Sequence, residues 1–321
     1  MRSVQTSVAV PLASVKPLDR LTSYRAFCLQ RTRDALAAGA TRRERCPVDG
    51  ERLEAFADVD GHAYRRCPRG GSLYAVHVAP PAQWSALLAQ VSAYRQSPSA
   101  FHADIARERT DTVYQPKLDW IVETLRLQGL ERPRAVDVTT LPSQFAELLA
   151  RSGMFAEVAT VDEMELAANP QPPQGVPADV AILLESLDRV PDAPGLVRAA
   201  ADRVGAGGLV FITALVASGF DVAVLGGHNL YLYPPDRTNC FTLRELEQLV
   251  HAAGLSIVES STPGMLDLEI VQAHLRRDPA IAVSRFERQL VETDGEARQA
   301  VQAFFQQQGL SSFARLVARK T

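Results

Sequence analysis

From residue 135 onward, short apolar runs alternate with segments of helical periodicity, and this alternation constrains the fold more than any other feature. The apolar runs cover residues 135–138, 156–161, 180–184 and 208–213. Strands that are apolar along their whole length and are separated by helices predict a parallel sheet covered by helices on both faces. The expected fold class is therefore α/β, with a doubly wound sheet.

The C-terminal part continues this pattern with a helical interruption. A helix is expected over 242–253, where Thr242 and Glu245 form a capping-box pair, and the strand "LSIVESS" follows it. Residues 266–308 are predicted to be helical. The closing "SSFARLVARK" holds an apolar run that fits a last strand or a helical turn, since so short a run does not distinguish them. If it is a strand, a helical insert precedes it.

The composition is that of an ordinary soluble globular protein. The chain has 321 residues, of which 46% are hydrophobic and 22% charged, and its formal net charge is −3. This charge gives no reason to expect nucleic acid or a membrane surface as a partner. Apolar runs are too short to span a bilayer, and "SVAVPLASV" is too short for a convincing secretory signal, so we expect a cytoplasmic protein with reduced thiols.

The N-terminal region divides into three further parts. Residues 1–45 form a basic extension, with nine Arg or Lys against three acidic residues, which fits a basic patch or targeting arm, or a solvated, partly mobile terminus. Residues 46–80 form a ribbon-like region. Residues 81–130 form a helical linker with two apolar faces, and residues 131–321 form the α/β domain.

Two turns in the ribbon-like region, "CPVDG" and "CPRGG", resemble the two halves of a small metal ribbon. Structural zinc needs four ligands, and each turn keeps one cysteine. The candidate ligands are Cys46, Asp49, Cys67 and His62, with His77 as an alternative to His62. The other interpretation is a metal-free small domain held by hydrophobic contacts. We expect substoichiometric zinc from the sequence.

The stretch "RAVDVTTLPSQFAELL", residues 134–149, is predicted to form a strand, a turn and a helix. In doubly wound folds this helix points its N-terminus at an anionic ligand group, and an acid after the second strand, here Asp162, binds ribose hydroxyls. The turn has no glycine. Thr139 and Thr140 resist left-handed φ, Leu141 adds a side chain where the ligand would pass, and Pro142 removes an N–H donor. A ligand-free strand-to-helix turn is the alternative.

Two other segments place polar residues at the same edge of the sheet. The strand at 180–184 ends at Glu185, and Asp188 follows, where ligands of open α/β sheets bind; polar residues in any loop are the alternative. The segment 217–241 is long and aromatic, which favours a lid or substrate-binding surface. His228 in it is a candidate general base or a simple exposed histidine, and Tyr231 and Tyr233 are further candidates for acceptor binding.

Taken together, this order resembles a family of class I S-adenosylmethionine-dependent methyltransferases with an N-terminal zinc ribbon, found in sugar, surface-polysaccharide and secondary-metabolite pathways. The resemblance rests on "ADVAILLESLDRVPDAPGLVRAAADRVGAGGLVFIT", "GFDVAVLG", "YLYPPDRTNCFTLRELEQLVHAAGLSIVESSTPGMLDLEIV" and "LSSFARLVARK". It implies a seven-stranded Rossmann-like sheet with an antiparallel last strand. The cofactor positions that it implies are Asp137, Thr139, Thr140, Asp162 and Glu185, and the ribbon positions are Cys46, Asp49, Cys67 and Gly70.

The chain departs from the family pattern in every functional segment. Thr139, Leu141 and Ser143 replace the three turn glycines, the usual Glu-His pair is Asp188-Arg189, the histidine of "PPxHxNxF" is an arginine, and two ribbon cysteines are missing. One hypothesis is methyl transfer from S-adenosylmethionine to a small sugar-like or natural-product acceptor. The second is a cofactor-free pseudo-methyltransferase that serves a protein partner as a scaffold subunit. A third is a changed enzyme that uses the same cleft for another small molecule.

Overall fold

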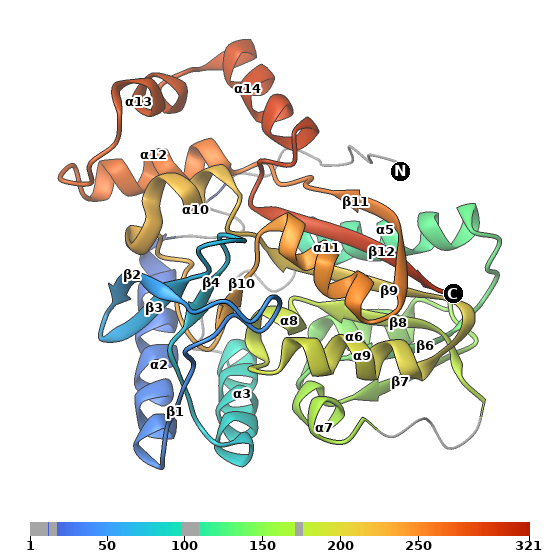
Figure 1. The fold of residues 1–321 in the computed structure, drawn as a ribbon. Coiled ribbons are helices and arrows are strands. Elements are labelled where there is room, and N and C mark those ends of the chain that lie inside the picture. Colours follow the sequence, from blue (N-terminus) through green and yellow to red (C-terminus); the bar gives the residue numbers. More distant parts are fainter. Residues whose placement is uncertain (1–11, 13–17, 98–108, 171–175) are drawn as a thin grey trace.

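The computed structural model describes residue 12 and residues 18–97, 109–170 and 176–321. Its centre is a six-stranded sheet in the order β11-β12-β9-β8-β6-β7 (Figure 1). β6, β7, β8 and β9 run parallel, and β12 pairs antiparallel with both β9 and β11. The strands of this sheet are β6 (Arg134–Val138), β7 (Glu157–Val161), β8 (Ala178–Leu184), β9 (Val204–Leu215), β11 (Leu255–Ser261) and β12 (Phe313–Lys320). The predicted doubly wound α/β fold is confirmed.

Helices cover both faces of the sheet, and each face has its own apolar cluster. One cluster joins α5 (Gln115–Leu127) and α6 (Gln144–Arg151) to Val180, Ile182 and Phe211. The other joins α7 (Glu163–Ala168), α9 (Ala193–Arg203) and α11 (Leu243–Ala252) to the residues that alternate with these along the strands. Successive side chains of a strand point to opposite faces, so strands buried on both sides must be apolar throughout.

Six strands, rather than the seven that the resemblance implies, form the sheet within the described residues. β7 lies at its edge. The link from α7 to β8 holds only nine residues, 169–177, and four of them are proline. Proline lacks the N–H donor that a strand needs, so this sequence is poorly suited to add a further strand beside β7.

The motif "GAGG", expected as a turn before the fourth strand, lies inside β9. Ala178 pairs with Val204 and Val180 with Leu209, so extra residues of β9 bulge at this point. Gly207 has φ of +78°, a conformation that glycine adopts without strain. The glycines therefore permit a bulge in a continuous strand instead of a connection between elements.

The N-terminal region packs against the sheet domain. α2 (Leu18–Ala37) buries Leu21, Tyr24 and Cys28 in the large core cluster, which corrects the expectation of a solvated terminus for this part of residues 1–45. Residues 1–11 and 13–17 lie outside the described residues. The remaining elements of this region are β1 (Thr41–Arg42), β2 (Glu54–Val59), β3 (His62–Arg66), β4 (Leu73–Ala75), β5 (His77–Val78), α3 (Pro81–Gln96) and the π-helix η1 (Thr110–Tyr114).

The segment 217–241 is largely buried, so the expectation of a lid is wrong, whereas the alternative of a substrate-binding surface stays a prediction. It forms α10 (Phe220–Leu225), the short helix η2 (Gly226–His228) and β10 (Asn239–Cys240), and β10 pairs with β4 of the N-terminal sheet β10-β4-β3-β2. The predicted helical insert is present: α12 (Asp267–Arg277), α13 (Arg285–Val291) and α14 (Gly295–Gln307) lie between β11 and β12 (Figure 1). A further short helix, α8 (Ser186–Arg189), follows β8. No described helix is long and apolar enough to cross a membrane.

Candidate active site and metal centre

A cleft of about 460 Å³ opens at the carboxyl ends of β6 and β8. Its walls come from the turn after β6, the start of α7, the segment after β8, α3, α5 and the segment 231–237. This is the position where open α/β sheets bind their ligands. The predicted residues that line it are Asp137, Thr139, Thr140, Glu185, Tyr231 and Tyr233.

The glycine-free turn 139–143 needs no glycine in the conformation that it adopts. None of its residues has a positive φ. Ser92 of α3 donates its hydroxyl hydrogen bond to the carbonyl oxygen of Pro142 at 2.6 Å, which ties the turn to that helix. Leu141 is 55% exposed and does not line the cleft, so the expectation that it stands in a ligand's path is wrong.

Asp137 is the most unusual group in the cleft wall. It lies in β6 with 2% of its surface exposed, and its Oδ2 has no hydrogen-bond partner among the described residues. Burial raises the pKa of its carboxyl to about 7, with a further rise from Glu163 and an opposing effect of Arg189. A buried carboxylate oxygen without a hydrogen-bond donor is costly, and a ligand that supplies a donor would remove this cost.

Asp162 does not line the cleft, which corrects its expected place. Its Oδ1 accepts hydrogen bonds from the backbone N–H of Met164 and Glu165, so the side chain caps α7. The next residue, Glu163, faces the cleft instead. Its fully buried carboxylate forms a two-armed ion pair with the guanidinium of Arg189, at 3.0 and 2.9 Å. The acid after β7 is therefore already partnered by a cation.

Glu185 adopts a strained backbone conformation in the cleft wall, with φ of +60°. Non-glycine residues in this region are uncommon and cluster at functional sites. The carboxylate lies between Lys117 Nζ, at 3.0 Å, and Arg237 Nη2, at 2.8 Å. Burial alone would raise the pKa of Glu185, but these two cations hold it well below its usual range. Glu185 is an anion in a cationic clamp.

Asp188 lies behind this clamp and does not line the cleft. It is fully buried, accepts a hydrogen bond from the backbone N–H of Leu215 at 3.0 Å, and pairs with Arg237 Nη1 at 3.1 Å. Burial raises its pKa to about 7, with Arg237 opposing and Glu185 reinforcing the rise. In this position the Asp188 carboxylate holds Arg237 in place and does not contact a methyl acceptor in the cleft.

The two tyrosines line the cleft as neutral phenols. Burial raises the pKa of Tyr231 and Tyr233, and the nearby acids Asp221 and Asp236 raise them further. Both are therefore poor bases at neutral pH. The Tyr233 hydroxyl already donates its hydrogen bond to Asp236 Oδ2 at 3.2 Å, so its oxygen is left to accept one. His228 is exposed, ends η2 and lies outside the cleft, so the structure agrees with its interpretation as an exposed histidine.

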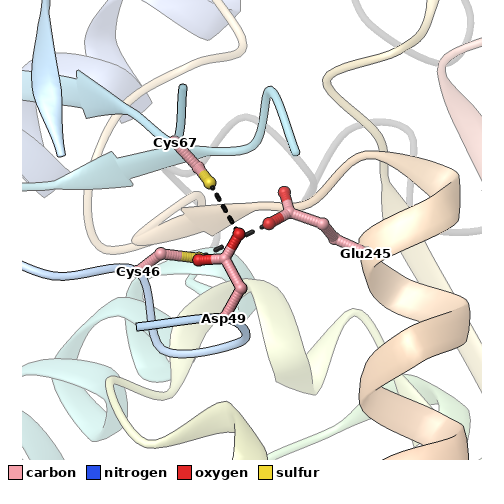
Figure 2. A group of neighbouring side chains, drawn as sticks. All are labelled: Cys46, Asp49, Cys67 and Glu245. Atoms are coloured by element: carbon pink, nitrogen blue, oxygen red, sulfur yellow. Dashed lines mark hydrogen bonds between the residues drawn. The ribbon is translucent and has the colours of Figure 1, made fainter. Parts of the chain in front are cut away.

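A second group of interest lies in the N-terminal sheet region, where Cys46, Asp49 and Cys67 come together as predicted (Figure 2). The fourth member is Glu245 of α11, and His62 is not part of the group, which corrects the predicted ligand set. One ligand atom from each of the four lies within 4.8 Å of the others. We call these four side chains the thiol-acid cluster.

Glu245 reaches the cluster because residue 70 is glycine. A Cβ atom on Gly70 would lie 1.8 Å from Glu245 Cδ, so any side chain there would displace the carboxylate. The separations Cys46 Sγ to Glu245 Oε1, 3.4 Å, and Cys67 Sγ to Asp49 Oδ2, 3.3 Å, are close to the sulfur–oxygen edge of about 3.6 Å that a tetrahedral zinc site would have. The residues present thus fit a divalent ion.

Several of these groups were missed by sequence reasoning. The sequence predicts a capping box with Glu245, yet only Thr242 caps α11, and the Glu245 carboxylate accepts a hydrogen bond from the backbone N–H of Ser72 instead. The sequence feature that could have indicated Glu245 is Gly70, a ribbon ligand position without a side chain. Lys117 and Glu163 carry no local signal, because their partners are distant in the sequence. Arg237 carries one, since it replaces the histidine of "PPxHxNxF", but the motif does not indicate its pairing with Glu185.

Comparison with protein-family models identifies one domain family. The model of a methyltransferase domain matches residues 83–260, which is more than half of the chain. The chain belongs to this methyltransferase family. No curated protein gives a significant match.

Solved structures with a similar fold include three methyltransferases of low similarity. The Galdieria sulphuraria protein, provisionally assigned as a sarcosine dimethylglycine methyltransferase, has 13% identity, a TM-score of 0.41, and coverage of 64% of this chain and 86% of its own. Phosphoethanolamine N-methyltransferase 2 of Haemonchus contortus, in complex with S-adenosyl-L-methionine, has 14% identity and a TM-score of 0.39, and the match covers 63% of this chain and 52% of that protein. A Thermotoga maritima protein named a possible histamine N-methyltransferase has 15% identity and a TM-score of 0.38, and the match covers 67% of this chain and 95% of that protein.

Proposed function

We propose that this methyltransferase-family protein binds S-adenosylmethionine in the cleft and transfers its methyl group to a small sugar-like or natural-product acceptor. The observation that carries the proposal is Asp137, a buried carboxylate in the cleft wall whose Oδ2 lacks a donor among the described residues. The ammonium group of the cofactor's amino acid part is a donor of the required charge. The turn 139–143 supports the proposal, because its path leaves Leu141 outside the cleft.

When bound, the cofactor supplies an activated methyl group, so the protein mainly has to bind and align. Asp137 would hold the amino acid end, and Thr139 in the same wall is a neighbouring polar contact. Tyr231 and Tyr233 would line the acceptor as neutral phenols, since their raised pKa keeps them protonated, and the Tyr233 oxygen would accept a hydrogen bond from an acceptor hydroxyl. No described side chain in the cleft is a histidine, so an acceptor that must lose a proton would have to use a carboxylate.

Calorimetry with S-adenosylhomocysteine from pH 6 to pH 8 tests this proposal. Asp137 has a pKa of about 7 and must be ionised to pair with an ammonium group, so affinity should rise about tenfold across this range. Asp137→Asn should bind weakly with no such rise. Asp119→Asn, an exposed change on α5 outside the cleft, should behave as the wild type. No saturable heat up to millimolar ligand, or an unchanged pH slope in Asp137→Asn, would contradict the proposal.

A cofactor-free pseudo-methyltransferase that acts as a partner or scaffold subunit remains the second candidate, and a specific observation favours it. Two acids of the cleft wall already hold internal cations: Glu163 has Arg189, and Glu185 has Lys117 and Arg237. Such pairs stabilise a ligand-free cleft and leave fewer acceptors for ribose hydroxyls. Absence of cofactor binding, together with retention of a protein partner by the intact chain, would establish this alternative.

We also infer that the thiol-acid cluster holds a structural divalent ion such as zinc. Two thiols and two carboxylates converge, and two sulfur–oxygen separations agree with a tetrahedral site. The cluster is remote from the cleft, since none of its four side chains lines the cleft wall. The ion would therefore serve stability and not methyl transfer.

A further inference from the structure

The cleft extends across the sheet from Asp137 and the turn after β6 to Leu215 of β9 and to Phe313 and Arg315 of β12. In the sheet order β12 is three positions from β6. With strands spaced by about 4.8 Å, this places β12 about 14 Å from β6. Groups on β12 are therefore suited to contact an acceptor rather than the cofactor end held by Asp137.

A row of polar residues crosses the sheet at the β12 end of the cleft, and of its three members Arg315 lines the cleft. Arg315 of β12 pairs in register with Thr213 of β9 and with Ser261 of β11. Residues directly opposite each other on neighbouring strands point to the same face of a sheet. All three side chains are buried, and Thr213 Oγ1, Ser261 Oγ and the Nε and Nη1 atoms of Arg315 have no hydrogen-bond partner among the described residues.

Arg315 itself lines the cleft while only 6% of its surface is exposed. Its guanidinium lies 5.1 Å from the centre of the Trp120 ring and 6.0 Å from that of Phe313. Burial lowers its pKa to about 10, with the nearby Glu259 opposing, so it stays cationic at neutral pH. The Glu259 carboxylate also accepts a hydrogen bond from Trp120 Nε1 at 2.9 Å.

The other cation of this region does not share its environment. Lys117 Nζ lies 5.3 Å from the centre of the Phe313 ring, but its charge is paired with that of Glu185. Arg315 is thus a buried charge with unused donors in the cleft wall, flanked by two hydroxyls with unused hydrogen-bonding capacity. Buried donors that stay unpaired are costly unless a ligand accepts from them.

We propose that Arg315, flanked by Thr213 and Ser261, binds an anionic group of the acceptor, a carboxylate or a phosphate monoester. Both groups accept two parallel hydrogen bonds from a guanidinium. Thr213 and Ser261 flank the guanidinium on the neighbouring strands, where their hydroxyls would help to position it. This inference rests on the proposed function in so far as it assigns the anion to the methyl acceptor. The binding of the anion itself does not depend on methyl transfer.

Titration with inorganic phosphate and with acetate, at ionic strength held constant with chloride, tests the subsite. The fluorescence of Trp120, which lies against the guanidinium, and calorimetry are the two readouts. At least one of the anions should bind saturably in the millimolar range, and their ratio of affinities distinguishes a phosphate from a carboxylate acceptor. Arg315→Gln should weaken this binding at least tenfold. Arg319→Gln, four residues along the same strand and outside the cleft wall, should change it less than twofold.

Thr213→Val keeps the shape of the side chain and removes its hydroxyl, so it should weaken anion binding at least threefold even if Arg315→Gln proves unstable. Saturation by neither anion, or a wild-type titration of both Arg315→Gln and Thr213→Val, would overturn the inference. S-adenosylhomocysteine binding is measured on the same proteins. Its retention in Arg315→Gln with loss of anion binding supports the subsite, whereas its absence in every protein with anion binding intact contradicts only the proposed function.

Discussion

The thiol-acid cluster and the cleft both lie where the sequence departs from the family pattern, but the structure treats the two departures differently. In the cluster, Glu245 from a distant helix occupies the place left by a missing ligand, and the group gains a side chain of the ligand kind. In the cleft, the acids Glu163 and Glu185 are paired with cations of the protein itself. The cluster is a cation site under our proposal, whereas these cleft acids are satisfied internally.

The strongest test of this comparison is to break an internal pair of the cleft. Arg189→Met leaves the fully buried Glu163 carboxylate without its ion-pair partner and should lower the free energy of unfolding by about 3–5 kcal/mol. Because the remaining cost is the unpaired charge, the double variant Arg189→Met with Glu163→Leu should recover most of the loss. Urea unfolding measures both proteins, and a single variant as stable as the wild type would show that the pair does not hold the cleft.

A smaller effect is expected from the cluster. The wild-type protein should contain about one zinc per chain by elemental analysis, a higher content than the sequence predicts, because Glu245 supplies the fourth ligand. Glu245→Ala should lose most of this zinc and about 2 kcal/mol of stability, since it also frees the N–H of Ser72. Glu247→Ala on the same helix should keep the zinc. Metal-free wild-type protein with the stability unchanged by chelator would show that hydrogen bonds alone hold the cluster.

The smallest effect concerns the turn. Leu141 is exposed and outside the cleft, so Leu141→Ala should change the affinity for S-adenosylhomocysteine by less than about 0.5 kcal/mol. Thr140→Val, which removes the hydroxyl that donates to Glu163 at 2.9 Å, is the matched change inside the wall and should have the larger effect. A greater loss in Leu141→Ala, measured by calorimetry, would mean that the turn moves when it binds its ligand.

The fold was largely predictable from the sequence, because strands buried on both faces must be apolar and the helices between them keep a regular period. The site was less predictable. Position after a strand singled out Glu185 correctly as a cleft residue, but it could not decide between Asp162 and Glu163, which differ only in the direction of the side chain. Partners such as Lys117 and Glu245 come from distant elements, and local patterns carry no information about such contacts.

The pairing of β10 with β4 has a consequence for how this protein can be divided. β10 follows directly after the segment that carries Tyr233 and Arg237 in the cleft wall, and its only strand partner in the described residues belongs to the N-terminal sheet. A chimera that exchanged residues 1–80 for those of another protein would replace β4, the strand with which β10 pairs next to this part of the cleft wall. The two sheets are therefore expected to be inherited together, as one unit of recombination.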